Sequence, residues 1–186
     1  MDLWWGRRNS NIAARFPRGL IRSRIDRVKS QRKIATASNS ASTYAGGITI
    51  KSSQELATMR QAGAIVAAVL ELLKRSVEPG ITTRELDNIA YKEIIRCGAR
   101  PTFKKYRGFP ASICTSINEE IVHGIPGRRA LQEGDIIKLD VGATLDGFIG
   151  DAAISVPVGR VSQVGAELID TTRLRLEEGI KAAQPS

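Results

Sequence analysis

Two aspartates, Asp140 and Asp151, lie where carboxylates are unusual. Residues 134–155, GDIIKLDVGATLDGFIGDAAIS, form two apolar runs on either side of Asp146-Gly147 and predict a β-hairpin. A four-residue loop at 144–147 would place Ala143 opposite Phe148 and Asp140 opposite Asp151, with their β-carbons about 5 Å apart. Carboxylates this close repel or share a proton, unless a divalent cation takes both as oxygen ligands. The pair is therefore a candidate metal site.

A second interpretation of the two aspartates stays open at this point. If the strand register differs by one residue, one of the two side chains faces water. Asp151 could also cap a turn beside Gly150. Spacing alone does not decide between a metal site and an ordinary solvated hairpin.

The chain has one histidine, His123, in residues 118–126, NEEIVHGIP. A histidine beside Gly and Pro in a loop is usually a surface or structural residue. It could instead donate a hydrogen bond to a polarised carbonyl, or to the intermediate of peptide cleavage. The two cysteines, Cys97 and Cys114, are too few for a disulfide framework and match no zinc motif, so we expect both to be reduced.

Two capping boxes predict where the first two helices begin. Ser52 and Glu55 open a helix that runs to about Arg75, and Thr82 and Glu85 open another that ends near Cys97. A short strand at 48–53 precedes them. The apolar positions at helical spacing, expected to face inward, are Leu56, Met59, Ile65, Val66, Val69, Leu70 and Leu73, then Leu86, Ile89, Ala90, Ile94 and Ile95.

After residue 98 the apolar pattern changes to that of strands. We expect a strand at 111–117, a turn with a short extended segment at 118–126, and two strands within 131–159. A third helix is predicted at about 164–182. Its candidate inward residues are Leu168, Ile169, Leu174, Leu176 and Ile180. This order of helices, strands and helix predicts an α+β fold.

The net charge of +9 is concentrated in residues 1–46, which hold ten Lys and Arg against two Asp. The other 140 residues carry 18 basic and 17 acidic side chains, and a 42% hydrophobic share is ample for a core. We therefore expect a basic leader, 1–46, before one domain, 47–186. The leader fits an organellar transit peptide, a basic arm that touches RNA or the ribosome, or a solvated disordered extension. No apolar run approaches the roughly 18 residues of a membrane span.

Two segments together resemble a known family. Residues 108–127, GFPASICTSINEEIVHGIPG, and residues 131–159, LQEGDIIKLDVGATLDGFIGDAAISVPVG, closely resemble the N-terminal half of the catalytic domain of type I methionine aminopeptidases. Residues 48–94 resemble the preceding segment of the same family. Proline-directed aminopeptidases and prolidases share the two aspartates but lack the NE…HGIP context. The combination is more specific than either segment alone.

The resemblance implies a pita-bread α+β fold, with an antiparallel sheet and flanking helices, and removal of the initiator methionine from nascent proteins. It implies one or two divalent ions, of Co, Mn, Fe or Zn. By motif, Asp140 would bind one ion and Asp151 would bridge both, while His123 would hold the substrate and stabilise the tetrahedral intermediate. The residues that would line the methionine pocket are Tyr106, Phe109 and Cys114. Arg107 stands where some members have His.

The resemblance also implies ligands that this sequence does not contain. The family uses a further His and two Glu from its second half, and here there is no second histidine. We therefore expect an incomplete or inactive, C-terminally truncated half that binds metal weakly. Expected partners are nascent N-termini, the ribosome and a complementing C-terminal half, in the cytoplasm, or in an organelle if the leader is a transit peptide. The alternative is a non-catalytic half-fold that binds the ribosome or RNA through the leader.

Overall fold

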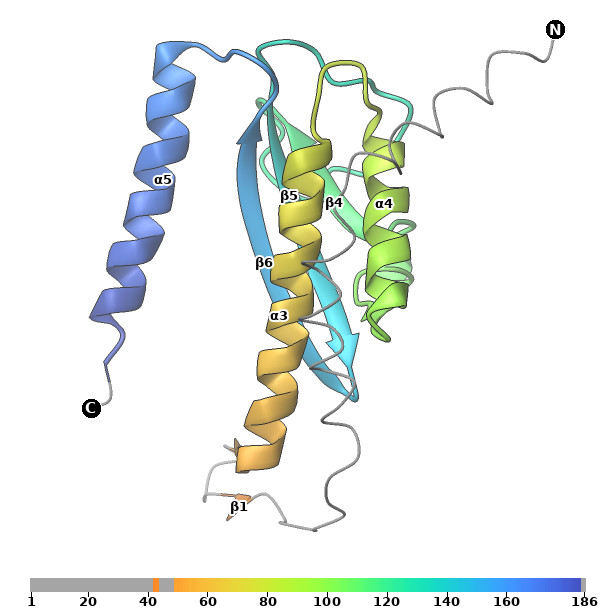
Figure 1. Cartoon of the computed structure of the whole chain (residues 1–186), viewed down its shortest axis with the longest axis vertical. Coiled ribbons are helices and arrows are strands. Elements are labelled where there is room, and N and C mark those ends of the chain that lie inside the picture. The colour runs from red at the N-terminus through yellow and green to blue at the C-terminus, as the bar shows by residue number, and fades with distance from the viewer. Residues whose placement is uncertain (1–41, 44–48, 185–186) are drawn as a thin grey trace, which may run out of the picture. The chain divides into compact units, whose positions relative to one another are not determined.

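The computed structural model describes residues 42–43 and 49–184, which belong to the unit Ala41–Ser186 (Figure 1). Nearly all of the predicted leader therefore lies outside the described residues. The elements are, in chain order, β1 (Ser42–Thr43), β2 (Thr49–Ile50), α3 (Ser53–Ser76), α4 (Thr83–Arg96), β3 (Arg100–Pro101), the 3₁₀ turn η2 (Tyr106–Gly108), β4 (Ile113–Ile117), β5 (Ile136–Leu145), β6 (Phe148–Pro157) and α5 (Gln163–Ala182). The predicted α+β class is confirmed.

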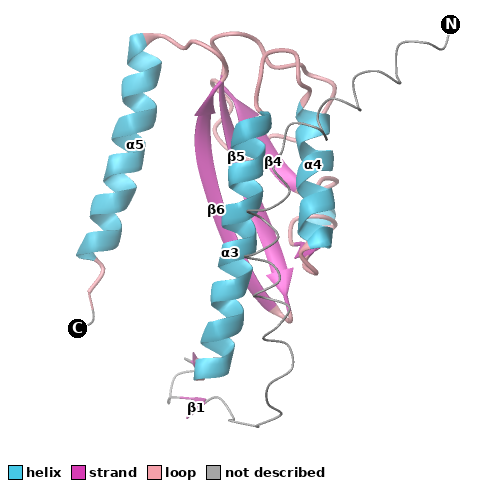
Figure 2. Cartoon of the chain, in the orientation of Figure 1, coloured by secondary structure: helices cyan, strands magenta, loops and turns pink. Residues whose placement is uncertain are grey.

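The main sheet is antiparallel and β5 is its central strand. β6 pairs with the whole of β5, whereas β4 and β3 pair with successive parts of it. Side chains in the first half of β5 alternate in burial, because neighbouring residues of a strand point to opposite faces, whereas residues 141–145 are all buried. On one face Ile137, Leu139, Val141, Ala143 and Leu145 are all buried. This face packs against α3 and α4, which lie on the same side of the strands (Figure 2).

The predicted helix starts are confirmed by capping hydrogen bonds. At α3 the Ser52 amide donates to Glu55 Oε2 at 2.7 Å, and the Glu55 amide donates to Ser52 Oγ at 3.3 Å. Thr82 and Glu85 make the same reciprocal pair at α4, at 2.9 and 3.2 Å. Each pair satisfies amides that have no partner within the first helical turn.

Most of the predicted inward residues of α3 and α4 are buried, but three predictions are wrong. Leu56, Met59 and Ile95 are exposed. The first two lie before Ala62, where β6 reaches the helix and a β-carbon on Gly150 would come within 2.6 Å of the Ala62 carbonyl. Ile95 follows the buried Ile94, so it points about 100° away from the core.

Helix α3 is long and apolar enough, by length and composition, to cross a membrane, and it is the one such helix among the described residues. Six residues on one side of this helix are buried in the hydrophobic core against the sheet: Ala62, Ile65, Val66, Val69, Leu70 and Leu73. The burial of this face against β5 and β6 accounts for its apolar composition.

Helix α5 has the predicted bounds, but four of the five residues predicted to face inward are exposed, and Ile169 is partly buried. The side chains of Leu168, Leu174, Leu176 and Ile180 are between 50% and 65% exposed. Gly165 is the buried residue of the helix. The exposure of these residues shows that most of the apolar side of α5 is not covered by the described residues.

Candidate functional site

The hairpin register places the two aspartates on one face, diagonally rather than opposite. Leu145 pairs with Phe148, so the loop is only Asp146-Gly147. Asp140 therefore lies opposite Ala153, and the predicted four-residue loop is wrong. Asp146 and Gly147 have φ of 47° and 87°, as the tight two-residue turn that matches strand twist requires.

The predicted shared face of Asp140 and Asp151 is confirmed by this register. Residues opposite each other on paired strands point to the same face, and Asp151 is two residues from Ala153, the partner of Asp140. Diagonal neighbours of this kind lie roughly 7 Å apart, within reach of two carboxylates that lean together. The face is the one that α3 and α4 leave uncovered.

The Asp140 carboxyl is held in an unfavourable environment for a charge. Partial burial raises its pKa most, and the negative charge of Asp151 and a hydrogen bond with it raise the pKa further. The charge of the nearby His123 acts the other way and lowers the pKa of Asp140. Asp140 Oδ1 is buried and has no hydrogen-bond partner in the described part of the chain. A bound cation would satisfy that oxygen and relieve the repulsion.

The two aspartates fit a divalent metal site in part. Carboxylate oxygens are suitable ligands for divalent cations. A buried carboxylate oxygen that has no hydrogen-bond partner among the described residues and lies beside a second carboxylate fits such a site. Within residues 42–43 and 49–184, however, no group of three or more His, Cys, Asp and Glu side chains could hold a metal ion. The described residues therefore supply two ligands of a site that needs more.

Cys114 extends this face onto the neighbouring strand. It lies on β4 directly opposite Asp140 and is buried. Burial, with the charges of Asp140 and Asp151, raises the pKa of its thiol to about 11. The thiol is therefore neutral at physiological pH and forms an apolar, polarizable wall beside the carboxylates.

His123 is held in a left-handed backbone conformation, with φ of 60°. The next residue, Gly124, is attached to β4 on both sides: its amide donates to Ser116 Oγ at 3.1 Å, and its carbonyl accepts from the Thr115 amide at 2.9 Å. A β-carbon on Gly124 would overlap the Thr115 carbonyl oxygen, so only glycine fits. This attachment sets the place of His123 near Asp140.

The other two predicted pocket residues, Tyr106 and Phe109, belong to the loop after β3. The Lys105 amide donates to the Phe109 carbonyl at 2.8 Å, and the Tyr106 amide donates to the Phe103 carbonyl at 2.9 Å. Phe109 is partly buried, whereas Tyr106 is 62% exposed. Their part in a methionine pocket stays a prediction.

Phe103 is a site residue that the sequence reasoning missed. A β-carbon on Gly142 would lie 2.6 Å from Phe103 Cε1, so the ring covers the strand at that point. Gly142 pairs with Asp151, which places this ring beside the carboxylates. The signal was Gly142 itself, because a glycine inside a strand often marks the close approach of another group.

A hairpin that presents two aspartates on its open face, with helices on the other, offers carboxylate ligands to a divalent cation. The sequence profile of Metallopeptidase family M24 matches residues 57–186, and the chain belongs to this family. This confirms the resemblance at the level of the family.

The curated relatives include two close bacterial proteins. Methionine aminopeptidase 1 of Bacillus subtilis is 50% identical over 138 residues, which are 74% of this chain and 56% of the relative. Methionine aminopeptidase of Clostridium acetobutylicum is 49% identical over 137 residues, 73% of this chain and 55% of the relative. The chain thus spans about half the length of the curated relatives it matches.

Solved structures confirm the expected pita-bread fold class. Methionine aminopeptidase from Thermotoga maritima superposes with a TM-score of 0.72 at 37% identity, covering 73% of this chain and 55% of that one. Aminopeptidase P from Escherichia coli superposes with a TM-score of 0.64 at 26% identity, covering 73% of this chain and 30% of that one. Both solved structures share this framework with the chain.

Replacing Gly124 by alanine should detach the histidine loop from β4. The methyl group would overlap the Thr115 carbonyl, so we expect a loss of about 1–3 kcal/mol of stability in urea unfolding. Because His123 is the sole histidine, its ring resonances report the loop directly by NMR. Gly127→Ala is the matched control, since its nearest neighbour would be 3.9 Å away. Unchanged His123 resonances in Gly124→Ala would contradict the attachment.

The thiol of Cys114 should react slowly with iodoacetamide at pH 8 in the folded chain, because its pKa lies near 11. Asp140→Asn removes one of the two charges that raise this pKa, so alkylation of Cys114 should become faster. The variant Cys97→Ser leaves Cys114 as the one thiol to follow by mass spectrometry. An equal rate with and without Asp140→Asn would show that the carboxylate does not act on the thiol.

Proposed function

We propose that this chain forms the two-aspartate half of a methionine aminopeptidase site, which removes the N-terminal methionine of nascent proteins. The observation that carries the proposal is Asp140, whose buried Oδ1 lacks a partner among the described residues while Asp151 lies beside it on the same face. The supporting comparison is the 50% identity to methionine aminopeptidase 1 of Bacillus subtilis.

In this proposal Asp140 and Asp151 hold the divalent ion, which the family resemblance gives as Co, Mn, Fe or Zn. When bound, such an ion supplies Lewis acidity for hydrolysis of the peptide bond. The two carboxylates set its position, because the hairpin register fixes them relative to Cys114 and Gly142. A site with two ligands binds weakly, so further ligands have to come from beyond the described residues.

His123 is proposed to donate a hydrogen bond to the oxygen of the scissile carbonyl. Its exposed ring near Asp140 is free to meet a substrate, and the attachment of Gly124 to β4 keeps its backbone in place. A donor that is already positioned stabilises negative charge on that oxygen without reorganisation.

The methionine side chain would lie against the neutral thiol of Cys114 and the rings of Phe103 and Phe109, with Tyr106 at the rim. Apolar and sulfur-containing walls favour a thioether over a charged side chain. The comparisons lend no support to the alternative of a non-catalytic module bound to the ribosome or RNA through the leader.

A chimera tests the proposed function. Residues 49–184 are joined to the part of Bacillus subtilis methionine aminopeptidase 1 that this chain does not match, and methionine release from a Met-Ala-Ser peptide is measured with added Co²⁺ or Mn²⁺. We expect turnover that falls about 100-fold or more in Asp140→Ala and in Asp151→Ala, since each removes a metal ligand.

The intact Bacillus subtilis enzyme, expressed in the same way, is the positive control. Asp146→Asn, in the hairpin turn rather than on the open face, is the matched control for loss of a carboxylate; asparagine tolerates the positive φ of this position, so the variant should retain turnover. A folded chimera without turnover, or turnover that survives Asp140→Ala, would contradict the proposal.

A further inference from the structure

The near-neutral body of the chain is charged unevenly. Residues 92–109 contain six Lys and Arg against the single acid Glu93, a net charge of +5. The rest of 47–186 contains twelve basic and sixteen acidic residues, a net charge of −4. This positive charge is separate from the leader, and the peptidase chemistry does not use it.

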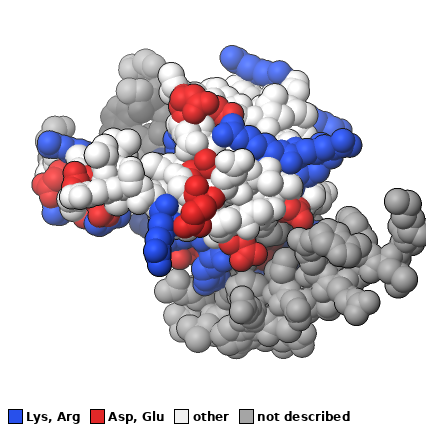
Figure 3. Space-filling model, turned by 90° about the horizontal axis from the view of Figure 1, so that it is seen from above, with Lys and Arg blue, Asp and Glu red and all other residues white. Residues whose placement is uncertain are grey.

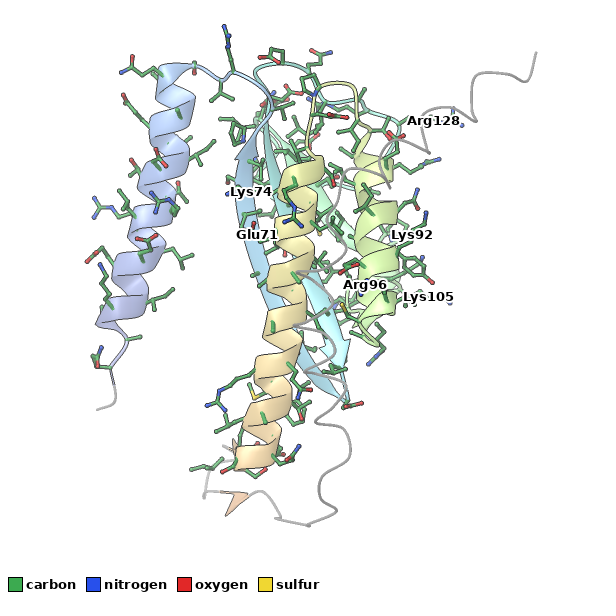
Figure 4. The ribbon with its side chains drawn as sticks, viewed as in Figure 1. Glu71, Lys74, Lys92, Arg96, Lys105 and Arg128 are labelled. Atoms are coloured by element: carbon green, nitrogen blue, oxygen red, sulfur yellow. The ribbon has the colours of Figure 1, made fainter. Side chains whose placement is uncertain are left out.

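The positive side chains of this segment are on the surface. Lys92 and Arg96 lie one turn apart on α4, and Arg100, Lys104 and Lys105 follow; all five are exposed. We call this set the basic face. Figure 4 shows Lys92, Arg96 and Lys105 along the outer side of α4. Figure 3, a view from above, shows Lys and Arg side chains interspersed with Asp and Glu on that side of the described residues.

Most of these cations are not neutralised by the protein. Arg96 forms an ion pair with Glu93, with Nε 2.7 Å from Oε2. Lys92, Arg100, Lys104 and Lys105 form no ion pair among the residues that the structure describes. The basic face is therefore available to an anionic partner.

Two exposed aromatic rings lie between the cations. Lys104 Nζ is 4.4 Å from the centre of the Tyr91 ring, and the Arg107 guanidinium is 5.5 Å from the centre of the Tyr106 ring. These rings are 39% and 62% exposed. Cations beside exposed tyrosines are the combination on which single-stranded nucleic acids bind, phosphate to cation and base to ring.

We propose that the basic face binds single-stranded RNA, with Lys92, Arg100, Lys104 and Lys105 on phosphates and Tyr91 under a base. Lys92 lies near the C-terminal end of α4, and the other three cations follow the helix in the chain. Aromatic stacking favours RNA over an acidic protein, which has no bases to stack.

The test uses the full-length chain and a fluorescein-labelled oligouridine of about 12 nucleotides, within the usual site size of a single-stranded binder. Affinity is measured by anisotropy over a series of salt concentrations. In the triple variant Lys92→Gln, Lys104→Gln, Lys105→Gln we expect weaker binding and a salt slope smaller by about 2, at roughly 0.7 per lost phosphate contact.

A matched triple, Arg60→Gln, Lys74→Gln, Arg175→Gln, removes the same charge from exposed positions elsewhere in the described structure and should change the slope little. Equal losses in both triples would overturn the proposal. Photocrosslinking with 4-thiouridine RNA should label the peptide that carries Tyr91; labelling confined to residues 1–46 would overturn the proposal. Equal competition by polyglutamate, or by vesicles containing phosphatidylserine, would also overturn it in favour of a general anion surface.

Discussion

The register of one hairpin is the constraint on which the rest of this structure depends. On β5, alternate residues form an apolar row under α3 and α4, and the residues between them include Asp140 and Gly142. A shift of one residue would place carboxylates in the core and apolar side chains outside, at a cost of several kcal/mol. The Asp146-Gly147 turn sets this register, because its two residues adopt the positive φ that a two-residue loop requires.

Around this hairpin the other site residues are positioned by backbone contacts rather than by their own packing. Cys114 is aligned with Asp140 by the β4 pairing, and His123 is held through the two hydrogen bonds of Gly124. Phe103 reaches the hairpin because Gly142 has no side chain. The Thr102 and Thr144 hydroxyls, 2.8 Å apart, attach that segment to β5. The arrangement brings the Cys114 thiol, the Phe103 ring and two carboxylates together, with His123 near Asp140.

The sequence predicted those parts of the fold that are specified by short motifs of neighbouring residues. Capping boxes identify the starts of α3 and α4, and an Asp-Gly pair identifies the hairpin turn, because each involves residues within three positions of each other. The pairing of Asp140 was wrong, since loop length cannot be read from strand composition. The inward side of α5 was wrong because periodicity describes a helix but not what packs against it.

The candidate site was recognised only in part from the sequence. Asp140, Asp151, Cys114 and His123 could be selected by residue type and family resemblance, and the structure places them near one another. Phe103 could not be selected, because its ring meets Gly142 across the fold. The left-handed backbone of His123 was equally hidden, since it results from the hydrogen bonds of its neighbour rather than from its own preference.

The central claim is that Asp140 and Asp151 together bind a divalent cation near His123. Titration of the full chain with Mn²⁺, followed by NMR of the His123 ring, tests it most directly, because the paramagnetic ion broadens nearby resonances and the chain has one histidine. The account predicts saturable broadening in the wild type that is lost in Asp140→Asn and in Asp151→Asn. Broadening that is absent, or that is unchanged in both variants, would contradict it.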